Sequence, residues 1–281
     1  MPSLGLSLGL GGVRVLGASL NFAALTALPE ERRAAVATAA NEAAATLGVT
    51  PQSVVDALAV GRGLCSMLPN DGCLLASSGG AVTVQGDPVG AIRSWTGVEL
   101  AAQSNASLQP VSAALGLVNS GNKIMSLGNL SAWVEGEGLC TLSPTFTTAL
   151  NTLWVVSGIP TGFASSREMI PNYNDSSFHI SFGATTRNII AGQFNTVSNT
   201  PFIYNVRTGV GNSVAVINAT TIMNRDVVVE FPAEGFLLNR EVVDPGFAGS
   251  MQSLTLNSAL YTTAQRAAVR EFCRNYYGVI Y

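Results

Sequence analysis

Two carboxylates on one expected strand are the first candidates for catalysis. Asp226 and Glu230 stand four residues apart in RDVVVEF, a stretch that alternates like a β-strand. At about 3.3 Å per residue their positions lie about 13 Å apart. Glycosidases hold their carboxyl groups about 5.5 Å apart for retention and about 6.5 to 9.5 Å apart for inversion, so this pair alone fits neither mechanism. We interpret both as polar residues on the solvent face of a strand, although a carboxylate from another strand could pair with either.

A histidine-dependent or metal-dependent site finds little support in the sequence. His179 is the single histidine, and no G-x-S-x-G, Cys-His or H-E-x-x-H pattern accompanies it. The cysteines stand far apart without a C-x-x-C pair, unlike zinc ligands; they are Cys65, Cys73, Cys140 and Cys273. Buried free thiols and disulfides, within or between chains, both stay open. We expect no catalytic residues, no metal ion, no cofactor and no enzymatic activity.

The best candidate for ligand binding is a polar and aromatic loop. The segment 171–177 has the sequence PNYNDSS and contains Asn172, Tyr173, Asn174 and Asp175. Sugar binding needs aromatic platforms and planar polar side chains, and this loop supplies both. Its two candidate calcium ligands, Asn174 and Asp175, fall short of the six or more oxygen donors that calcium takes. The other available aromatics are interpreted as core or strand packing: Trp95, Trp133, Trp154 and Tyr204.

The composition excludes several classes of function. The 281 residues carry 14 basic and 17 acidic side chains without a basic run, so nucleic-acid binding has no electrostatic basis. Glycines and serines interrupt the apolar segment 1–28 and no basic region precedes it, which argues against a signal peptide or membrane insertion. Because only 11% of residues are charged and the mean hydropathy is +0.34, we expect other copies of the chain or neighbouring proteins to cover part of the surface.

The first 60 residues differ in composition and expected secondary structure from the rest of the chain. Pro29 and the two glutamates after it suit the first turn of a helix, which is expected to end at Gly48. Thr50 and Pro51 then begin a second helix. The first helix is rich in alanine and buries little area, so we expect it to dock on a partner or a symmetry mate. Residues 1–60 are therefore predicted to be a helical and extended segment for anchoring and oligomerisation.

Residues 61–281 are predicted to form a separate, mainly β domain. Short strand-like runs broken by Gly, Asn, Pro and Ser are typical of a sandwich or jelly roll. Strands are expected at 152–156, 178–182, 202–206, 213–218, 226–231 and 251–257. Thr262 and Gln265 form a capping box that begins a final helix, and Gly278 ends it. The apolar stripe of this helix consists of Val269, Phe272, Cys273 and Tyr276.

GDPVGAIRSWTG at 86–97 and YYGVI at 276–280 belong to two segments that resemble the concanavalin A-like, laminin G-type jelly-roll domains of phage and bacterial surface proteins. Near the C terminus, Gly249, Leu260, the turn 262–266 and YYGVI at 276–280 are similar to the closing strand, turn and helix of that family, with Gln265 replacing its usual glutamate. Earlier in the chain, GDPVGAIRSWTG at 86–97 and QSNASLQPV at 103–111 resemble the family's opening, without its aspartate in the SG turn. The resemblance implies a jelly roll of two antiparallel sheets over about residues 64–281, with a flanking C-terminal helix, and its motifs are structural.

The resemblance also implies a function. Phage virion proteins are similar in joining a small-residue, Leu-Gly-rich N terminus to such a domain. We expect a non-enzymatic tail fibre, spike or head and collar appendage on the particle surface, attached to other virion proteins through residues 1–60. A homotrimer or another symmetric homo-oligomer would display the jelly roll to host surface glycan. Two alternatives stay open: an architectural capsid or neck decoration protein that binds other virion proteins, and a glycan-degrading enzyme on the same fold.

Overall fold

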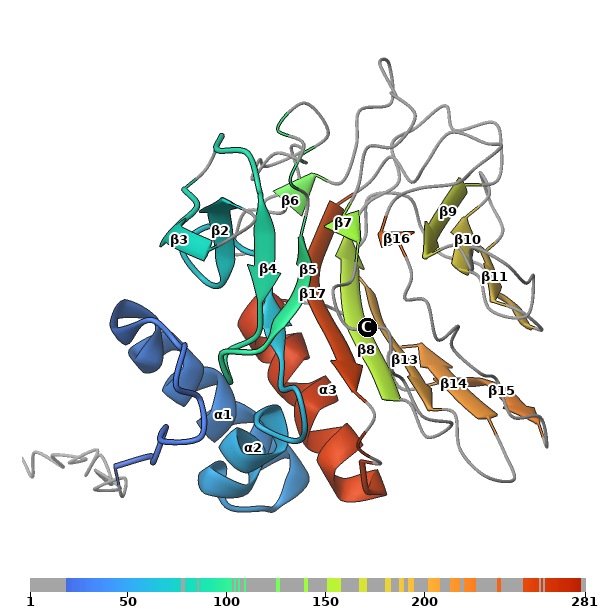
Figure 1. The fold of residues 1–281 in the computed structure, drawn as a ribbon. Coiled ribbons are helices and arrows are strands. Elements are labelled where there is room, and N and C mark those ends of the chain that lie inside the picture. Colours follow the sequence, from blue (N-terminus) through green and yellow to red (C-terminus); the bar gives the residue numbers. More distant parts are fainter. Residues whose placement is uncertain are drawn as a thin grey trace, which may run out of the picture.

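The structure is a computed structural model, drawn in Figure 1. It describes residues 19–76, 79–84, 86–102 and 261–278, together with the strands between residues 125 and 257 and four single residues, 104, 106, 109 and 259. Side chains are described for 19–72, 80–84, 86–100, 102, 104, 106, 109, 253, 255, 257, 259 and 261–278, and the other strand residues are described as backbone. In this part of the chain, a layer of helices lies beside antiparallel sheets (Figure 1).

The first N-terminal helix ends and the second begins where the sequence predicts, but the turn expected to open the first helix after Pro29 is a 3-10 turn. A 3-10 turn, η1 (Glu30–Arg32), leads into α1 (Arg33–Leu47), and α1 ends at Gly48 in the left-handed conformation with φ 68°. α2 (Pro51–Leu58) follows, and the Thr50 side chain caps it by accepting from the backbone N–H of residue 53 at 3.3 Å. Proline at the first helical position costs no hydrogen bond, because that N–H has no intrahelical partner.

The C-terminal helix, α3 (Thr263–Tyr277), also has the predicted ends. Thr262 and Gln265 form the complete capping box, with hydrogen bonds of 3.2 Å and 2.9 Å in the two directions. Gly278 ends the helix with φ 66°. Among the described residues, no helix has the length and apolar character needed to cross a membrane.

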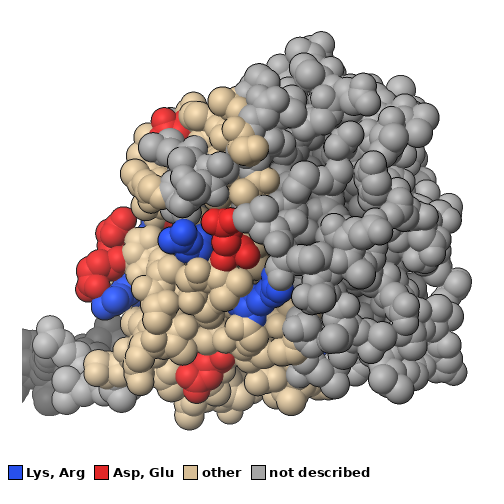
Figure 2. Space-filling view, viewed as in Figure 1, with Lys and Arg blue, Asp and Glu red and all other residues tan. Residues whose placement is uncertain are grey.

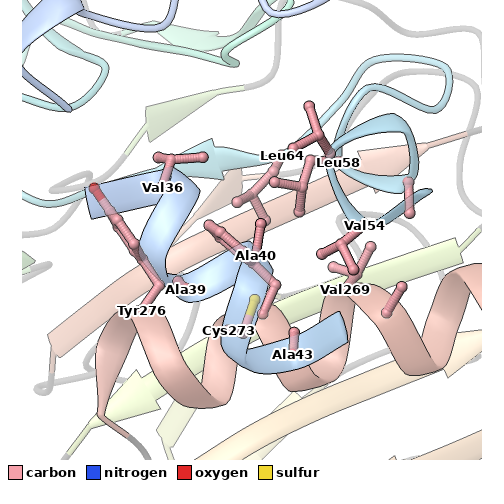
Figure 3. Packing of buried hydrophobic residues seen from close by; sticks show 14 of the residues in the cluster. Val36, Ala39, Ala40, Ala43, Val54, Leu58, Leu64, Val269, Cys273 and Tyr276 are labelled. Carbon is pink, nitrogen blue, oxygen red and sulfur yellow. The ribbon is translucent and has the colours of Figure 1, made fainter. Parts of the chain in front are cut away.

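The three α-helices share one hydrophobic core, shown in Figure 3. The small side chains of Ala39, Ala40 and Ala43 on α1 lie over α3 close to Cys273. Alanines let two helices approach closely, so this face packs well although each residue buries little area. α2 completes the core with apolar residues that are fully buried, namely Val54, Val55, Ala57 and Leu58. The expectation that α1 needs another molecule to dock on is therefore corrected, because α3 of the same chain covers its alanine face.

The described strands form three antiparallel sheets. The largest has the order β1 (Cys65–Ser66), β17 (Ser250–Asn257), β8 (Asn151–Ser157), β13 (Phe202–Arg207), β14 (Ser213–Ile217) and β15 (Thr220–Arg225), with β6 (Met125–Ser126) also paired to β17. The second has the order β16 (Leu237–Leu238), β7 (Leu139–Cys140), β5 (Glu99–Ala102), β4 (Ala91–Arg93), β2 (Cys73–Ala76) and β3 (Gly79–Val82). The third has the order β12 (Gly192–Phe194), β11 (Arg187–Ile189), β10 (Ile180–Phe182) and β9 (Arg167–Ile170).

The described residues contain antiparallel β-sheets and a C-terminal helix, as predicted. The strands expected at 152–156, 202–206, 213–218 and 251–257 are β8, β13, β14 and β17, with bounds that differ by at most one residue. β10 coincides with the last three residues of the strand expected at 178–182, whose first two residues lie outside the described residues, as does the whole strand expected at 226–231. The strand order of three sheets does not by itself establish a two-sheet jelly roll, which remains a proposal.

Candidate functional site

The predicted ligand loop lies outside the described residues. This holds for Asn172, Tyr173, Asn174 and Asp175, and also for His179, Asp226 and Glu230. Of the other aromatic candidates, Trp154 on β8 and Tyr204 on β13 are described as backbone, where they are register partners across the two strands. Trp133 lies outside the described residues.

Trp95 belongs to the core, as its interpretation as a packing residue predicts. Its side chain is completely buried and meets Phe272 and Tyr276 of α3 edge to face, at ring-centroid distances of 6.0 Å and 5.6 Å. The indole Nε1–H donates to the carbonyl of Asp71 at 3.1 Å. A tryptophan held in this way is unavailable as a sugar platform.

Asp71, whose carbonyl accepts from this indole, is the centre of a buried cluster of polar side chains. One carboxylate oxygen of Asp71, Oδ2, accepts hydrogen bonds from the Ser66 hydroxyl at 2.6 Å and from the Tyr276 hydroxyl at 3.0 Å. The other oxygen, Oδ1, lies 2.5 Å from Nε of Arg32, without the alignment of a hydrogen bond. Arg32 also donates from Nη2 to the carbonyl of Pro69 at 2.8 Å. The Asp71 cluster, meaning Asp71, Arg32, Ser66 and Tyr276, therefore joins η1, β1 and α3.

Burial dominates the electrostatics of this cluster. Loss of hydration raises the pKa of Asp71 from 3.8 to about 6, against the opposing effects of the Arg32 guanidinium and the Ser66 and Tyr276 hydroxyls. Nearby Glu31 adds a smaller increase. Burial also raises the pKa of the Tyr276 hydroxyl, and the neighbouring Asp71 carboxylate raises it further. The hydroxyl is therefore a hydrogen-bond donor throughout the physiological range.

The Asp71 cluster has groups suited to acid–base chemistry but no room for a substrate. The side chain of Asp71 is 0% exposed, and Ser66 and Trp95 are also completely buried. A general acid must come within hydrogen-bond reach of the reacting atom, and the walls of this cluster leave no such approach. The contacts of Asp71 are those of a residue that holds elements together.

Sequence reasoning missed Asp71 because of its local context. It stands in the segment PNDG at 69–72, which is typical of an exposed turn. The backbone does turn there, and Asn70 has a φ of 66°. The apolar runs on both sides of the turn, in a chain with only 11% charged residues, were the available signal that this acid is buried.

The two described cysteine thiols, Cys65 and Cys273, are free and buried. Cys65 lies on β1 and Cys273 on α3. The Cys65 thiol donates to the carbonyl of Arg93 at 3.3 Å, whereas the Cys273 thiol lies near Ser253. Burial raises the pKa of Cys273 to about 12, so this thiol is unreactive at neutral pH. Within the described residues, no group of three or more His, Cys, Asp or Glu side chains could hold a metal ion.

A surface cleft of about 600 Å³ opens between the segment 19–26 and Arg33. Arg33 is its one charged residue, and it forms an ion pair with the exposed Glu30 at 2.7 Å. The backbone N–H of Asn21 donates to Gln52 at 2.8 Å, so this polar group is also satisfied. Figure 2 shows scattered charges of both signs on the described part of this face and no patch of one sign. The cleft offers no convergent set of polar groups that would define a ligand.

Comparisons with known proteins give weak structural similarities only. No protein-family model matches the sequence. No curated protein matches it as a relative. One similar structure is domain 4 of a GH43 extracellular arabinanase from Geobacillus stearothermophilus, in complex with arabinotriose. It is 14% identical in sequence and gives a TM-score of 0.38. The match covers 55% of this chain and 84% of that chain.

Two other solved structures are similarly distant. The CBM40 domain of Ruminococcus gnavus IT-sialidase, bound to α2,3 sialyllactose, is 10% identical with a TM-score of 0.34, covering 43% of this chain and 82% of that chain. Trypanosoma rangeli sialidase is 10% identical with a TM-score of 0.45, and the match covers 79% of this chain but only 38% of the sialidase. At these scores the likeness decides neither the fold nor a ligand.

Proposed function

We propose that this chain is a structural protein of a tailed-phage virion, and that its β region binds glycan on the host surface. The protein is a non-enzymatic fibre, spike or head and collar appendage at the particle surface. It assembles as a symmetric homo-oligomer and attaches to other virion proteins through its N-terminal segment, residues 1–60. Its ligand loop contains Asn172, Tyr173, Asn174 and Asp175.

The observation that supports this proposal is the contact between the two segments that carry the family resemblance. GDPVGAIRSWTG at 86–97 and the closing segment from 249 onwards are more than 150 residues apart in the sequence. In the structure, Trp95 of the first packs edge to face against Phe272 and Tyr276 of the second. Motifs that define one fold are expected to meet in its core, so their contact favours a common origin with the jelly-roll proteins that they resemble.

The described surface refines the part of the proposal that concerns assembly. Large hydrophobic side chains that are exposed in the described part are Val49, Val84 and Val98, which do not amount to a broad apolar patch. Residues of the segment 25–58 also supply side chains to the core shared with α3. We therefore propose that attachment depends on residues 1–18, whose removal deletes none of the described core residues.

Replacing Tyr173 with alanine is expected to weaken glycan binding by about thirtyfold, or about 2 kcal/mol, because an aromatic platform supplies much of the energy of a sugar site. The measurement is titration of the full-length protein with purified polysaccharide from the host surface and with a panel of glycans. Tyr173→Phe, which keeps the ring, is the matched control and should bind nearly as well as the natural sequence.

The outcomes of that titration separate the alternatives. Equal affinity of the natural protein and Tyr173→Ala would remove the loop from the proposal. No binding by a folded, assembled natural protein would favour the architectural role, in which the β region contacts other virion proteins. Cleavage of the polysaccharide that is lost in Asp226→Asn or Glu230→Gln would instead establish the glycan-degrading alternative.

A further inference from the structure

The Asp71 cluster ties three separated segments of the chain to one carboxyl group. Arg32 stands at the start of the N-terminal helices, Ser66 is on β1, and Tyr276 is near the end of α3. Asp71 also holds Trp95 through its backbone carbonyl. These contacts join the helical layer to the β region at Asp71. We propose that Asp71 is a proton-controlled latch, which holds the helical layer more firmly when its carboxyl group is neutral than when it is ionised.

The charges around Asp71 make the ionised state costly. Arg32 is the cation in contact with the carboxylate, and its own side chain is 28% exposed and thus partly hydrated. Glu31, on the same turn, opposes the negative charge. From α3 the titratable neighbours are Tyr276 and Tyr277, both of which are neutral at physiological pH because burial raises their pKa. One partly hydrated cation thus faces a carboxylate that has lost all of its own water.

The hydroxyl groups of the cluster can also accept a hydrogen bond from the neutral carboxyl group. A hydroxyl group both donates and accepts, so Ser66 or Tyr276 can reverse its hydrogen bond and accept the proton of the carboxyl group. Arg32 keeps its hydrogen bond to the carbonyl of Pro69 and its contact with solvent. Protonation therefore removes a buried charge while the carboxyl group stays hydrogen-bonded to a hydroxyl group.

The direction of the pH effect follows from this preference. Because the pKa of Asp71 is raised from 3.8 to about 6 in the folded protein, the folded state takes up a proton before the unfolded state does as the pH falls. The stabilisation is complete below about pH 4 and is lost as the pH rises through 6. Between pH 7.5 and pH 4.5, this one group should lower the unfolding equilibrium constant by about thirtyfold.

Urea unfolding of the full chain at several values between pH 4.5 and 7.5 tests the latch. Asp71→Asn keeps the shape of the side chain but cannot titrate, so its pH dependence should lack the thirtyfold component found in the natural protein. Glu42→Gln, which removes an exposed carboxylate from α1, is the matched control and should keep that component. The chain contains one histidine, a residue type whose ordinary pKa falls in the same range, so the quantity compared is the difference between each variant and the natural protein.

Two results would overturn the proposal. One is the same pH dependence in Asp71→Asn as in the natural protein. The other is a difference of opposite sign, with Asp71 stabilising the fold as the pH rises, which would show that the ion pair with Arg32 dominates. If Asp71→Asn fails to fold, Arg32→Gln replaces it in the same experiment. Removing the cation should then move the midpoint of the pH dependence upwards, and an unchanged midpoint would refute the latch.

Discussion

Replacing Trp95 with alanine is expected to lower the free energy of unfolding by about 4 kcal/mol, as large-to-small changes of buried aromatic residues do. The indole is completely buried, packs against Phe272 and Tyr276, and donates to the carbonyl of Asp71. Alanine would leave a cavity between α3 and the turn that carries residue 95, and an unsatisfied carbonyl. Equilibrium unfolding in urea, followed by far-UV circular dichroism, measures the change.

Two control variants separate packing from the hydrogen bond. Trp95→Phe keeps most of the buried ring but loses the donor, so it should cost about 1 to 2 kcal/mol. Val98→Ala, at a position that is 37% exposed, should change stability by less than about 0.5 kcal/mol. A loss in Trp95→Ala no larger than in Val98→Ala would mean that Trp95 does not join the two segments as the structure describes.

Gly63→Ala is expected to cost about 3 kcal/mol, because the new methyl group adds a clash to backbone strain. Gly63 has a φ of 74°, and a Cβ atom there would lie 2.4 Å from Cγ2 of Thr96 and 3.1 Å from the carbonyl oxygen of Leu58. Thr96 cannot easily turn away, since its hydroxyl donates to the carbonyl of Arg62 at 2.6 Å. Thermal and urea unfolding measure the loss.

Gly48→Ala is the matched control for this substitution. Gly48 has nearly the same backbone conformation, with a φ of 68°, but no atom lies within 4 Å of the position of a new Cβ. It should therefore cost only the backbone strain of about 1 kcal/mol. Equal costs for the two variants would contradict the close packing of the α2–β1 connection against the turn at Thr96.

Local signals explain why the helices were predictable. Each helix boundary is set by residues within a few positions of it. Thr50 with Pro51 begins α2, and the capping box of Thr262 and Gln265 begins α3. Gly48 and Gly278 end α1 and α3, and the structure contains all of these features. The short strand-like runs broken by Gly, Asn, Pro and Ser likewise located β8, β13 and β17. Because these features depend only on neighbouring residues, the helix and strand boundaries can be predicted from the sequence alone.

Long-range contacts explain what the sequence did not predict. The alanine face of α1 is compatible with any close-packed surface, and nothing near it identifies α3, more than 200 residues away, as that surface. Asp71 has the local pattern of an exposed turn, and only its contacts with Arg32, Ser66 and Tyr276 make it a buried centre. The predicted ligand loop at 172–175 lies outside the described residues and remains a prediction.

The most direct test of the central proposal is the protein content of purified phage particles. The full chain and a variant lacking residues 2–18 are produced in turn during infection, and quantitative mass spectrometry counts the copies in each particle. The proposal predicts a fixed number of copies of the full chain and almost none of the variant, although the two unfold at the same temperature in isolation. Absence of the full chain from the particles would contradict a virion role, and equal incorporation of the variant would contradict attachment through residues 1–18.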